Sequence, residues 1–190
     1  MKSQVRVLAF DDGPFKFSDK HTHLVGALVR LPNYVEAVLV GKAEVDCSDA
    51  CAVIARLIQG SRYREQIKAV MLDGAAVGGF NVVDIDALSQ ETGIPVVTVT
   101  RDKPDMKAVK SALKKNFDDW EDRYGILSRR KLRKLDTGHN PIYYDCAGMK
   151  PSEAEQLIKK SIVRGAIPEP LRIAHIIATA LARGESRGRA

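Results

Sequence analysis

Short apolar runs that end at polar residues recur along the first hundred positions of the chain. Their content of Val and Ile and their length predict strands. The runs occupy residues 6–10, 24–31, 37–45, 69–72 and 94–100. The connections between the first three are short, and a parallel crossover needs about a dozen residues or more. We therefore predict that these three strands form an antiparallel meander.

Apolar residues spaced three and four apart predict helices between and after the later strands. They cover about 50–60, 82–93, 104–116, 120–127, 152–165 and 167–183, with a brief strand at 142–144. Ser48 or Asp49 is the expected N-cap of the first helix, and Asn81 that of the second. A helix between the strands at 69–72 and 94–100 predicts a right-handed parallel crossover. The order of elements is therefore that of an α/β protein with a mixed sheet.

Composition places the chain among globular proteins. Its 190 residues suit one domain, 1–190, and 45% apolar with 28% charged residues is an ordinary balance. No apolar run approaches the roughly 20 residues that cross a bilayer, so we expect a cytoplasmic protein without a membrane partner. The three cysteines are expected to be reduced thiols, with Cys47 and Cys51 as small core residues rather than metal ligands.

Positive charge gathers in the second half of the chain. The formal net charge is +6, and residues 101–137 hold twelve Lys or Arg against seven Asp or Glu. Arg129, Arg130 and Lys131 begin the densest run, which suits contact with the backbone of a nucleic acid, and we expect that partner to be DNA. The alternative for such a run is a solvated helix face.

Carboxylates follow three of the predicted strands. Asp73 ends the buried run 69–72, at the end of a strand where α/β sheets place their chemistry. Asp11 and Asp12 end the first strand, and only one of them can point to a given side because adjacent strand residues face opposite ways. Asp46 follows the third strand. Taken singly, each of these residues has a structural alternative as a turn former or helix cap.

The order of elements is that of the ribonuclease H-like fold: three antiparallel strands followed by parallel strands, with helices on both faces. In that fold the first and fourth strands are neighbours, so Asp12 and Asp73 are expected to meet. Asp46 is the third member of the predicted set, with Glu44 and Asp49 as near alternatives. Hard divalent ions such as Mg²⁺ take oxygen ligands, and two of them can clamp the oxygens of a phosphodiester. The set therefore predicts metal-dependent cleavage of nucleic acid.

Motifs over nearly the whole chain resemble a known archaeal family, which is related to endonuclease V and is named endonuclease dU. They are DDG at 11–13, YVEAVLVG at 34–41, MLDG at 71–74, GGFN at 78–81, IPVVTV at 94–99, and RGAIPEP at 164–170 with Arg172 and His175. The resemblance implies a ribonuclease H-like fold and Mg²⁺ or Mn²⁺ as cofactor. It also implies cleavage of strands that contain a deaminated base, with deoxyuridine as the leading candidate.

The resemblance to endonuclease V can be followed residue by residue. Its first-strand aspartate corresponds to Asp11 or Asp12, its Val-Asp-Gly-His-Gly motif to residues 72–76, and its next acid to Asp46 or Glu44. The wider fold takes a further ligand from a late helix, for which Glu169 or His175 is available. On this reading Asp12, Asp46, Asp73 and Glu169 are the catalytic set, and Asp11, Asp12, Asp46 and Asp73 are the metal ligands.

Two departures from endonuclease V concern recognition of the base. Ala75 stands where its motif has histidine, and the Pro-Tyr-Val-Pro wedge is reduced to residues 33–36, which include Tyr34. A protein of this fold that binds nucleic acid without cutting it is therefore the alternative function.

Small residues after Asp73 are the remaining candidates for contact with nucleic acid. Tyr34, Gly74, Gly78 and Gly79 are the candidate contacts, although Gly78 and Gly79 also suit the close passage of a neighbouring strand. Neither Gly-Lys-Ser/Thr nor Gly-x-Gly-x-x-Gly occurs, so we expect no dinucleotide cofactor.

Overall fold

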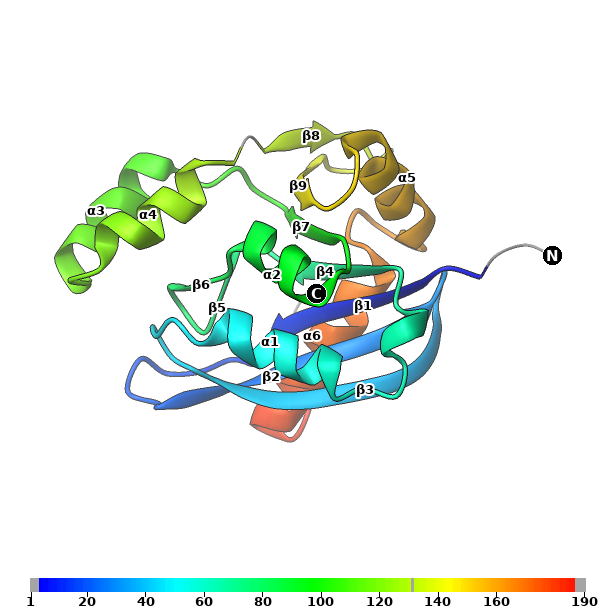
Figure 1. Cartoon of the computed structure of the whole chain (residues 1–190), viewed down its shortest axis with the longest axis horizontal. Helices are drawn as coiled ribbons and strands as arrows, with labels where there is room; N and C mark the ends of the chain where they lie inside the picture. Colours follow the sequence, from blue (N-terminus) through cyan, green and yellow to red (C-terminus); the bar gives the residue numbers. More distant parts are fainter. Residues whose placement is uncertain (1–3, 131, 187–190) are drawn as a thin grey trace.

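A seven-stranded mixed sheet forms the centre of the computed structural model, which describes residues 4–130 and 132–186 (Figure 1). The strand order is β3-β2-β1-β4-β7-β9-β8. The strands of this sheet are β1 (Arg6–Asp12), β2 (His21–Arg30), β3 (Tyr34–Glu44), β4 (Ala69–Asp73), β7 (Val96–Thr100), β8 (Arg133–Leu135) and β9 (Ile142–Ala147). A separate two-stranded ribbon consists of β5 (Ala76–Val77) and β6 (Asn81–Val82).

Pairing of the strands follows the predicted topology for the first five strands of the large sheet. β1, β2 and β3 form the antiparallel meander, while β4 pairs in parallel with both β1 and β7. Beyond β7 the sheet becomes antiparallel again through β9 and β8. β8 was not predicted: it lies in the basic run, where a solvated helix face was the alternative, and its three residues are too few to show alternation.

Helices cover both faces of the sheet, and the alternation of each strand decides which side chains meet them. α1 (Ala50–Gln59) and α2 (Ile85–Thr92) pack on the face that carries Leu8 and Phe10. α5 (Pro151–Ser161) and α6 (Glu169–Arg183) pack on the opposite face, which carries Val7 and Ala9. Figure 1 shows α1 and α2 in front of the sheet and α6 behind it. A single 3₁₀ turn, Arg64–Gln66, precedes β4.

The predicted cap of α2 was wrong. Asp84 is the N-cap, and its carboxylate accepts hydrogen bonds from the backbone N–H groups of Asp86 and Ala87. Asn81 lies in β6 instead, fully buried, and accepts a hydrogen bond from the backbone N–H of Ala50 at the start of α1. Asn81 thus satisfies an N-terminal donor of α1 from a distance of thirty-one residues along the chain.

Two antiparallel helices after β7 form a projection that we call the arm. It consists of α3 (Met106–Asn116) and α4 (Trp120–Ser128), at the left of Figure 1. The carboxylate of Asp105 caps α3 by accepting hydrogen bonds from the N–H groups of Lys107 and Ala108, as expected for a helix that opens near Pro104. Leu113 is the buried residue of α3, so the arm has a small apolar core of its own beside the sheet.

Candidate active site

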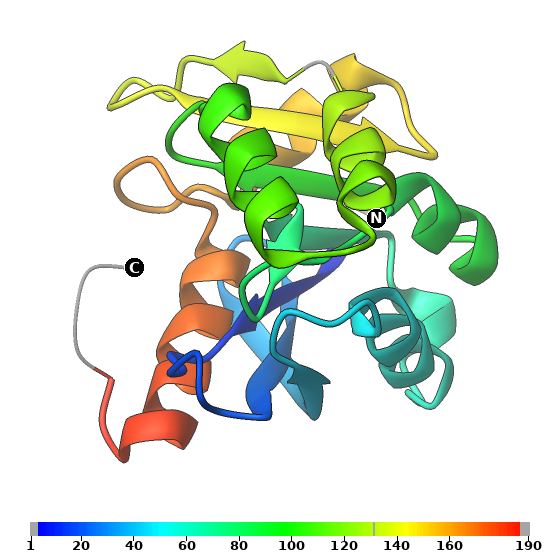
Figure 2. The ribbon, with the colours of Figure 1, turned by 90° about the vertical axis from the view of Figure 1, so that its left-hand side faces the viewer.

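Three carboxylates meet where the parallel strands β1 and β4 end. Asp11 and Asp12 close β1, and Asp73 closes β4. Phe10 is paired with Leu72 in the parallel register, so the next positions, Asp11 and Asp73, lie side by side although sixty-two residues separate them in the sequence. Figure 2 shows the end of β1 beside α6, with α3 and α4 above it. We call Asp11, Asp12 and Asp73 the acidic edge.

Strand alternation divides the acidic edge between the two faces of the sheet. Ala9 and Met71 belong to the core under α6, so Asp11 and Asp73, two residues further on, point to the same face. Asp12 points to the other face, where its Oδ2 accepts a hydrogen bond of 3.2 Å from the N–H of Gly78. The sequence analysis expected Asp12 to meet Asp73, with Asp11 as the alternative, whereas the structure places Asp11 on the same face as Asp73 because Ala9 and Met71 share that face.

His175 is the residue of the late helix α6 that reaches the acidic edge. Its Nδ1 lies 2.8 Å from Oδ2 of Asp11, and this hydrogen bond raises the pKa of His175. Glu169, the late-helix residue predicted to be catalytic, instead forms hydrogen bonds of 2.9 and 2.6 Å with Arg172 one turn along α6. Burial of the apolar face of α6 against β1 and β2 sets which of its residues face the site.

Electrostatics at the acidic edge favour protonated carboxyl groups. Burial and the charge of Asp11 raise the pKa of Asp12 to about 7. The side chain of Asp73 reaches solvent, yet burial of its carboxyl group among protein atoms and the charge of Asp11 raise its pKa to about 6. Within the part of the chain that the structure describes, Asp12 and Asp73 form no ion pair with Lys or Arg. The positive charges of Arg101 and His175 act on Asp73, but they only partly offset burial and the charge of Asp11.

Asp46, the third predicted ligand, holds the loop between β4 and α2. It has a positive φ of 57°, its N–H donates to the carbonyl of Gly78, and its Oδ1 accepts a hydrogen bond of 2.8 Å from the N–H of Phe80. A Cβ on Gly79 would lie 2.2 Å from that same oxygen, which explains the glycine. The structure thus gives Asp46 a structural partner and shows no contact between it and the acidic edge.

The two alternatives to Asp46 also have local partners. Oε1 of Glu44 lies 3.7 Å from Nε2 of His21. The carboxylate of Asp49 accepts hydrogen bonds from the side chain of Asn81 and from the N–H of Glu44. Both residues therefore stabilise the junction between β3 and α1.

A cavity of about 640 Å³ opens next to Asp73. Its walls are mostly apolar and come from the loop after β4, from β7 and from the arm; they include Gly74, Gly79, Phe80, Met106 and Tyr124, with Thr98, Arg130 and Asp145 among the polar residues. This volume falls within the range of roughly 300–1,000 Å³ that is typical of small-molecule sites. Gly74 and Gly79 therefore border a ligand-sized space, whereas Gly78 packs against Thr22.

Acidic residues form ion pairs with Arg129 and Arg130 of the basic run that was predicted to contact the backbone of a nucleic acid. Arg129 forms a 2.7 Å ion pair with Asp84, and Arg130 forms ion pairs with Asp86 and Asp145. Lys131 lies outside the described residues. The arginines of this run thus fasten the end of the arm to α2 and β9.

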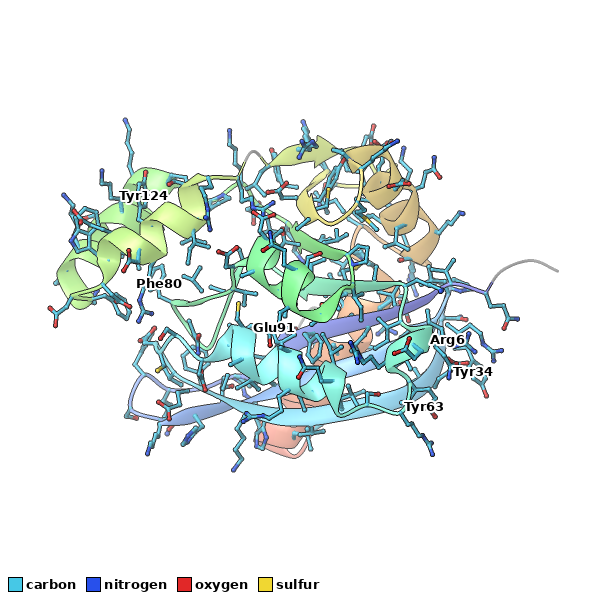
Figure 3. The ribbon with its side chains drawn as sticks, in the orientation of Figure 1. Arg6, Tyr34, Tyr63, Phe80, Glu91 and Tyr124 are labelled. Atoms are coloured by element: carbon cyan, nitrogen blue, oxygen red, sulfur yellow. The ribbon has the colours of Figure 1, made fainter. Side chains whose placement is uncertain are left out.

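Tyr34 lies at the opposite end of the sheet from the acidic edge. It begins β3 opposite Arg30, whereas Asp12 lies opposite Leu24 near the other end of β2. At 3.2–3.4 Å per residue this separation is about 20 Å. Figure 3 shows Tyr34 near Arg6, the first residue of β1. The structure therefore does not bring Tyr34 to the predicted site.

The donor set at the acidic edge fits a hard divalent ion that keeps most of its water ligands. Among residues 4–130 and 132–186, no group of three or more His, Cys, Asp or Glu side chains is arranged to hold a metal ion. Mg²⁺, however, is usually bound through one or two carboxylates together with substrate phosphates rather than in a complete protein cage. Asp11 and Asp73 supply such a pair, and a bound cation would lower the raised pKa of Asp73.

Comparison with known proteins identifies the family. The family model for endonuclease dU matches residues 3–182. The chain belongs to the endonuclease dU family. A UPF0215 protein of Methanothermobacter thermautotrophicus is 42% identical over 192 residues, which cover 100% of this chain and 94% of that protein. The similarity to this relative thus extends along nearly the whole length of both chains.

Solved structures extend the relationship to more distant proteins. The crystal structure of a protein of unknown function from Archaeoglobus fulgidus is 38% identical, with a TM-score of 0.84 and coverage of 94% of this chain and 98% of that one. Endonuclease V of Ciona intestinalis, in complex with a 24mer DNA containing an inosine followed by a ribo-adenosine, is 12% identical with a TM-score of 0.58, covering 92% and 84%. The endonuclease dU fold is therefore ribonuclease H-like, as predicted from the order of elements.

Family and fold together support a nuclease. The helices of the described residues include none that is long and apolar enough to cross a membrane.

Proposed function

We propose that this protein is a divalent-metal-dependent endonuclease that hydrolyses phosphodiester bonds in nucleic acid containing a deaminated or otherwise modified base, with DNA containing deoxyuridine as the first candidate. The observation that carries the proposal is the acidic edge. Burial and the nearby charge of Asp11 raise the pKa of Asp12 and of Asp73, which is a costly arrangement for a fold, and such perturbed groups cluster at functional sites. The name of the family and its likeness to endonuclease V support the same class of reaction.

Each residue of the acidic edge has a distinct task in this proposal. Asp11 and Asp73 hold the ion, and the hydrogen bond from His175 fixes the orientation of the Asp11 carboxylate. Asp12 turns to the loop, where its hydrogen bond with Gly78 positions the backbone that leads to the cavity. When bound, Mg²⁺ or Mn²⁺ supplies positive charge that neutralises the phosphate and activates a nucleophile.

The cavity supplies a place for the modified base. Enzymes that recognise a single base take it out of the stack into a pocket. The cavity lies beside Asp73, and Phe80 and Tyr124 in its walls suit the flat face of a heterocycle. Arg130 and Asp145, which form an ion pair at 3.4 Å, make up part of the polar wall of the cavity.

The test is cleavage of labelled oligonucleotides that carry uracil, hypoxanthine or no lesion, with Mg²⁺, Mn²⁺ or a chelator. We expect the wild type to cut a modified strand only with a divalent ion, and Asp73→Asn to lose that cleavage while keeping its folded structure. Absence of cleavage on every substrate, or equal cleavage by Asp73→Asn, would contradict the proposal.

The second candidate is a nucleic-acid-binding protein of the same fold that does not cleave. Ala75, at a position where the endonuclease V motif carries histidine, favours it. Salt-sensitive binding that a chelator leaves unchanged, without cleavage of any of the three substrates, is the result expected for this alternative.

A further inference from the structure

The arm carries a row of lysines that no carboxylate neutralises. Lys107, Lys110 and Lys114 lie within about 60° of one another around α3, because 3.6 residues complete a helical turn. Within residues 4–130 and 132–186 none of the three forms an ion pair with Asp or Glu. This row differs from the basic run after α4, where Arg129 and Arg130 are held by acidic residues.

Two aromatic rings of α4 lie beside the same row. Nζ of Lys110 lies 5.0 Å from the ring centroid of Tyr124, and Nζ of Lys114 lies 4.4 Å from that of Trp120. Both rings are partly exposed. Lysines and rings therefore form one surface, which we call the arm face: Lys107, Lys110, Lys114, Trp120 and Tyr124.

The arm face continues into the cavity beside Asp73. Tyr124 belongs to both, and Lys103 extends the positive charge to the wall of the cavity. Figure 3 shows Tyr124 on the arm and Phe80 below it on the loop that follows β4. A chain that lay along the arm face would thus arrive at Gly74, the residue that follows Asp73.

Arg123 fixes the arm to the loops of the active site. Its buried guanidinium donates hydrogen bonds to the carbonyl oxygens of Asp46, Cys47 and Phe80, at 3.0, 2.9 and 2.6 Å, and to the carboxylate of Asp119. One side chain thus connects α4 to both the loop after β3 and the loop after β4. The arm face is therefore held at a set position relative to Asp73.

We propose that the arm face binds a single-stranded segment of nucleic acid next to the cleavage site, which rests on the proposed nuclease function. Lysines that lack acidic partners attract phosphates and release counterions. Trp120 and Tyr124 offer faces on which unpaired bases stack, and the combination of a positive groove with exposed rings is typical of single-strand binding. A duplex hides its base faces, so the rings favour a single strand over a duplex.

The experiment uses Trp120, the single tryptophan of the chain, as its own probe. Addition of an unmodified 20-mer single-stranded DNA in the presence of a chelator is expected to quench tryptophan fluorescence, and added salt is expected to reverse the quenching. The corresponding duplex is expected to quench less. In the variant with Lys107→Gln, Lys110→Gln and Lys114→Gln, the slope of log Kobs against log salt should fall by roughly 2, at about 0.7 per lost phosphate contact.

A matched triple variant controls for net charge. Lys68, Lys159 and Lys160 are exposed and lie outside the arm, and their change to Gln should leave the salt slope at the wild-type value. Trp120→Leu, followed by anisotropy of labelled DNA, should weaken binding by roughly 5-fold or more.

Three outcomes would overturn the proposal: no quenching by the single strand, equal quenching by the duplex, or the same salt slope in both triple variants. Since no divalent ion is present, this result is independent of cleavage. If the wild type cleaves DNA but the triple variant at Lys107, Lys110 and Lys114 keeps the wild-type salt slope, only the proposal for the arm face is refuted. If that variant has the reduced salt slope but the wild type does not cleave, only the proposed nuclease function is refuted.

Discussion

The charged side chains at the two ends of β1 are arranged in opposite ways: those at its start form ion pairs, whereas those at its end are carboxylates gathered together. At the first, Arg6 donates two hydrogen bonds to the carboxylate of Glu36, at 2.5 and 3.1 Å, and Arg30 lies 3.3 Å from the same carboxylate. At the other, Asp11 lies beside Asp73 and His175 while Asp12 points to the opposite face, and the pKa values of Asp12 and Asp73 are raised. Arg6, Arg30 and Glu36, which we call the paired end, stabilise the fold, whereas the gathered carboxylates of the acidic edge destabilise it. Such destabilising groups are typical of sites for binding or catalysis.

The largest expected effect separates two adjacent residues of the acidic edge. Asp11→Asn removes a carboxylate that faces Asp73, and we expect cleavage to fall by more than roughly 100-fold, because loss of a direct metal ligand should cost more than the roughly 10–100-fold that loss of an outer-shell partner costs. Asp12→Asn keeps the hydrogen-bond acceptor for Gly78, so the cleavage rate of this variant should fall less than that of Asp11→Asn. The measurement is the single-turnover cleavage rate of both variants at saturating Mn²⁺.

Circular dichroism of the two variants is the control for folding, because Asn retains the size of Asp. Equal losses for the two variants, or a larger loss for Asp12→Asn, would show that strand alternation does not decide which carboxylate serves the site.

The sequence was sufficient for the order of elements and for the meeting of β1 with β4, because apolar runs and short connections restrict topology. It was not sufficient for the side chains. Asp11 and Asp12 both follow the first apolar run, so the sequence pattern does not distinguish them. Only the packing of α6 shows which one contacts His175. Asp46 follows a strand as a ligand would, but its carboxylate accepts a hydrogen bond from the N–H of Phe80, a contact that depends on the fold of a loop thirty-four residues away.

The second prediction concerns stability against pH without divalent ions. Burial and the charge of Asp11 raise the pKa of Asp12 from its ordinary value of 3.8 to about 7 in the folded protein, so the folded protein retains a proton that the unfolded chain releases. Stability should therefore decrease as the pH rises from about 4 to 7, by about 4 kcal/mol at most from Asp12. Thermal melts at pH 5 and pH 8 measure this difference.

Asp12→Asn should make the stability of the protein depend less on pH and should raise its Tm at pH 8. Mg²⁺ or Mn²⁺ should raise the Tm of the wild type more at pH 8 than at pH 5, because protons and metal ions compete for the same oxygens. A wild-type Tm that rises steadily between pH 5 and pH 8 without metal would contradict the assignment.

The third prediction tests the paired end of the sheet. Glu36→Gln removes the charge that Arg6 and Arg30 share, while the amide keeps most of the packing. Since hydrogen bonds between charged groups contribute about 1.5–3 kcal/mol, we expect the free energy of unfolding in urea to fall by about that amount. Cleavage should remain at the wild-type rate, and a loss of cleavage with intact stability would reverse the roles of the two ends.

The smallest expected effect is at Tyr34, the residue that the likeness to a base-prying wedge had suggested. Arg30 lies over its ring at 4.4 Å, so Tyr34→Ala should cost about 0.5–1 kcal/mol of stability through this cation–π contact. Its distance of about 20 Å from the acidic edge, at 3.2–3.4 Å per residue, predicts unchanged cleavage and preference for a modified base. Tyr124→Ala is the matched comparison, because that ring lines the cavity. If Tyr34→Ala, and not Tyr124→Ala, abolished the preference, the paired end would take part in recognition, and the contrast between the two ends of β1 would not hold.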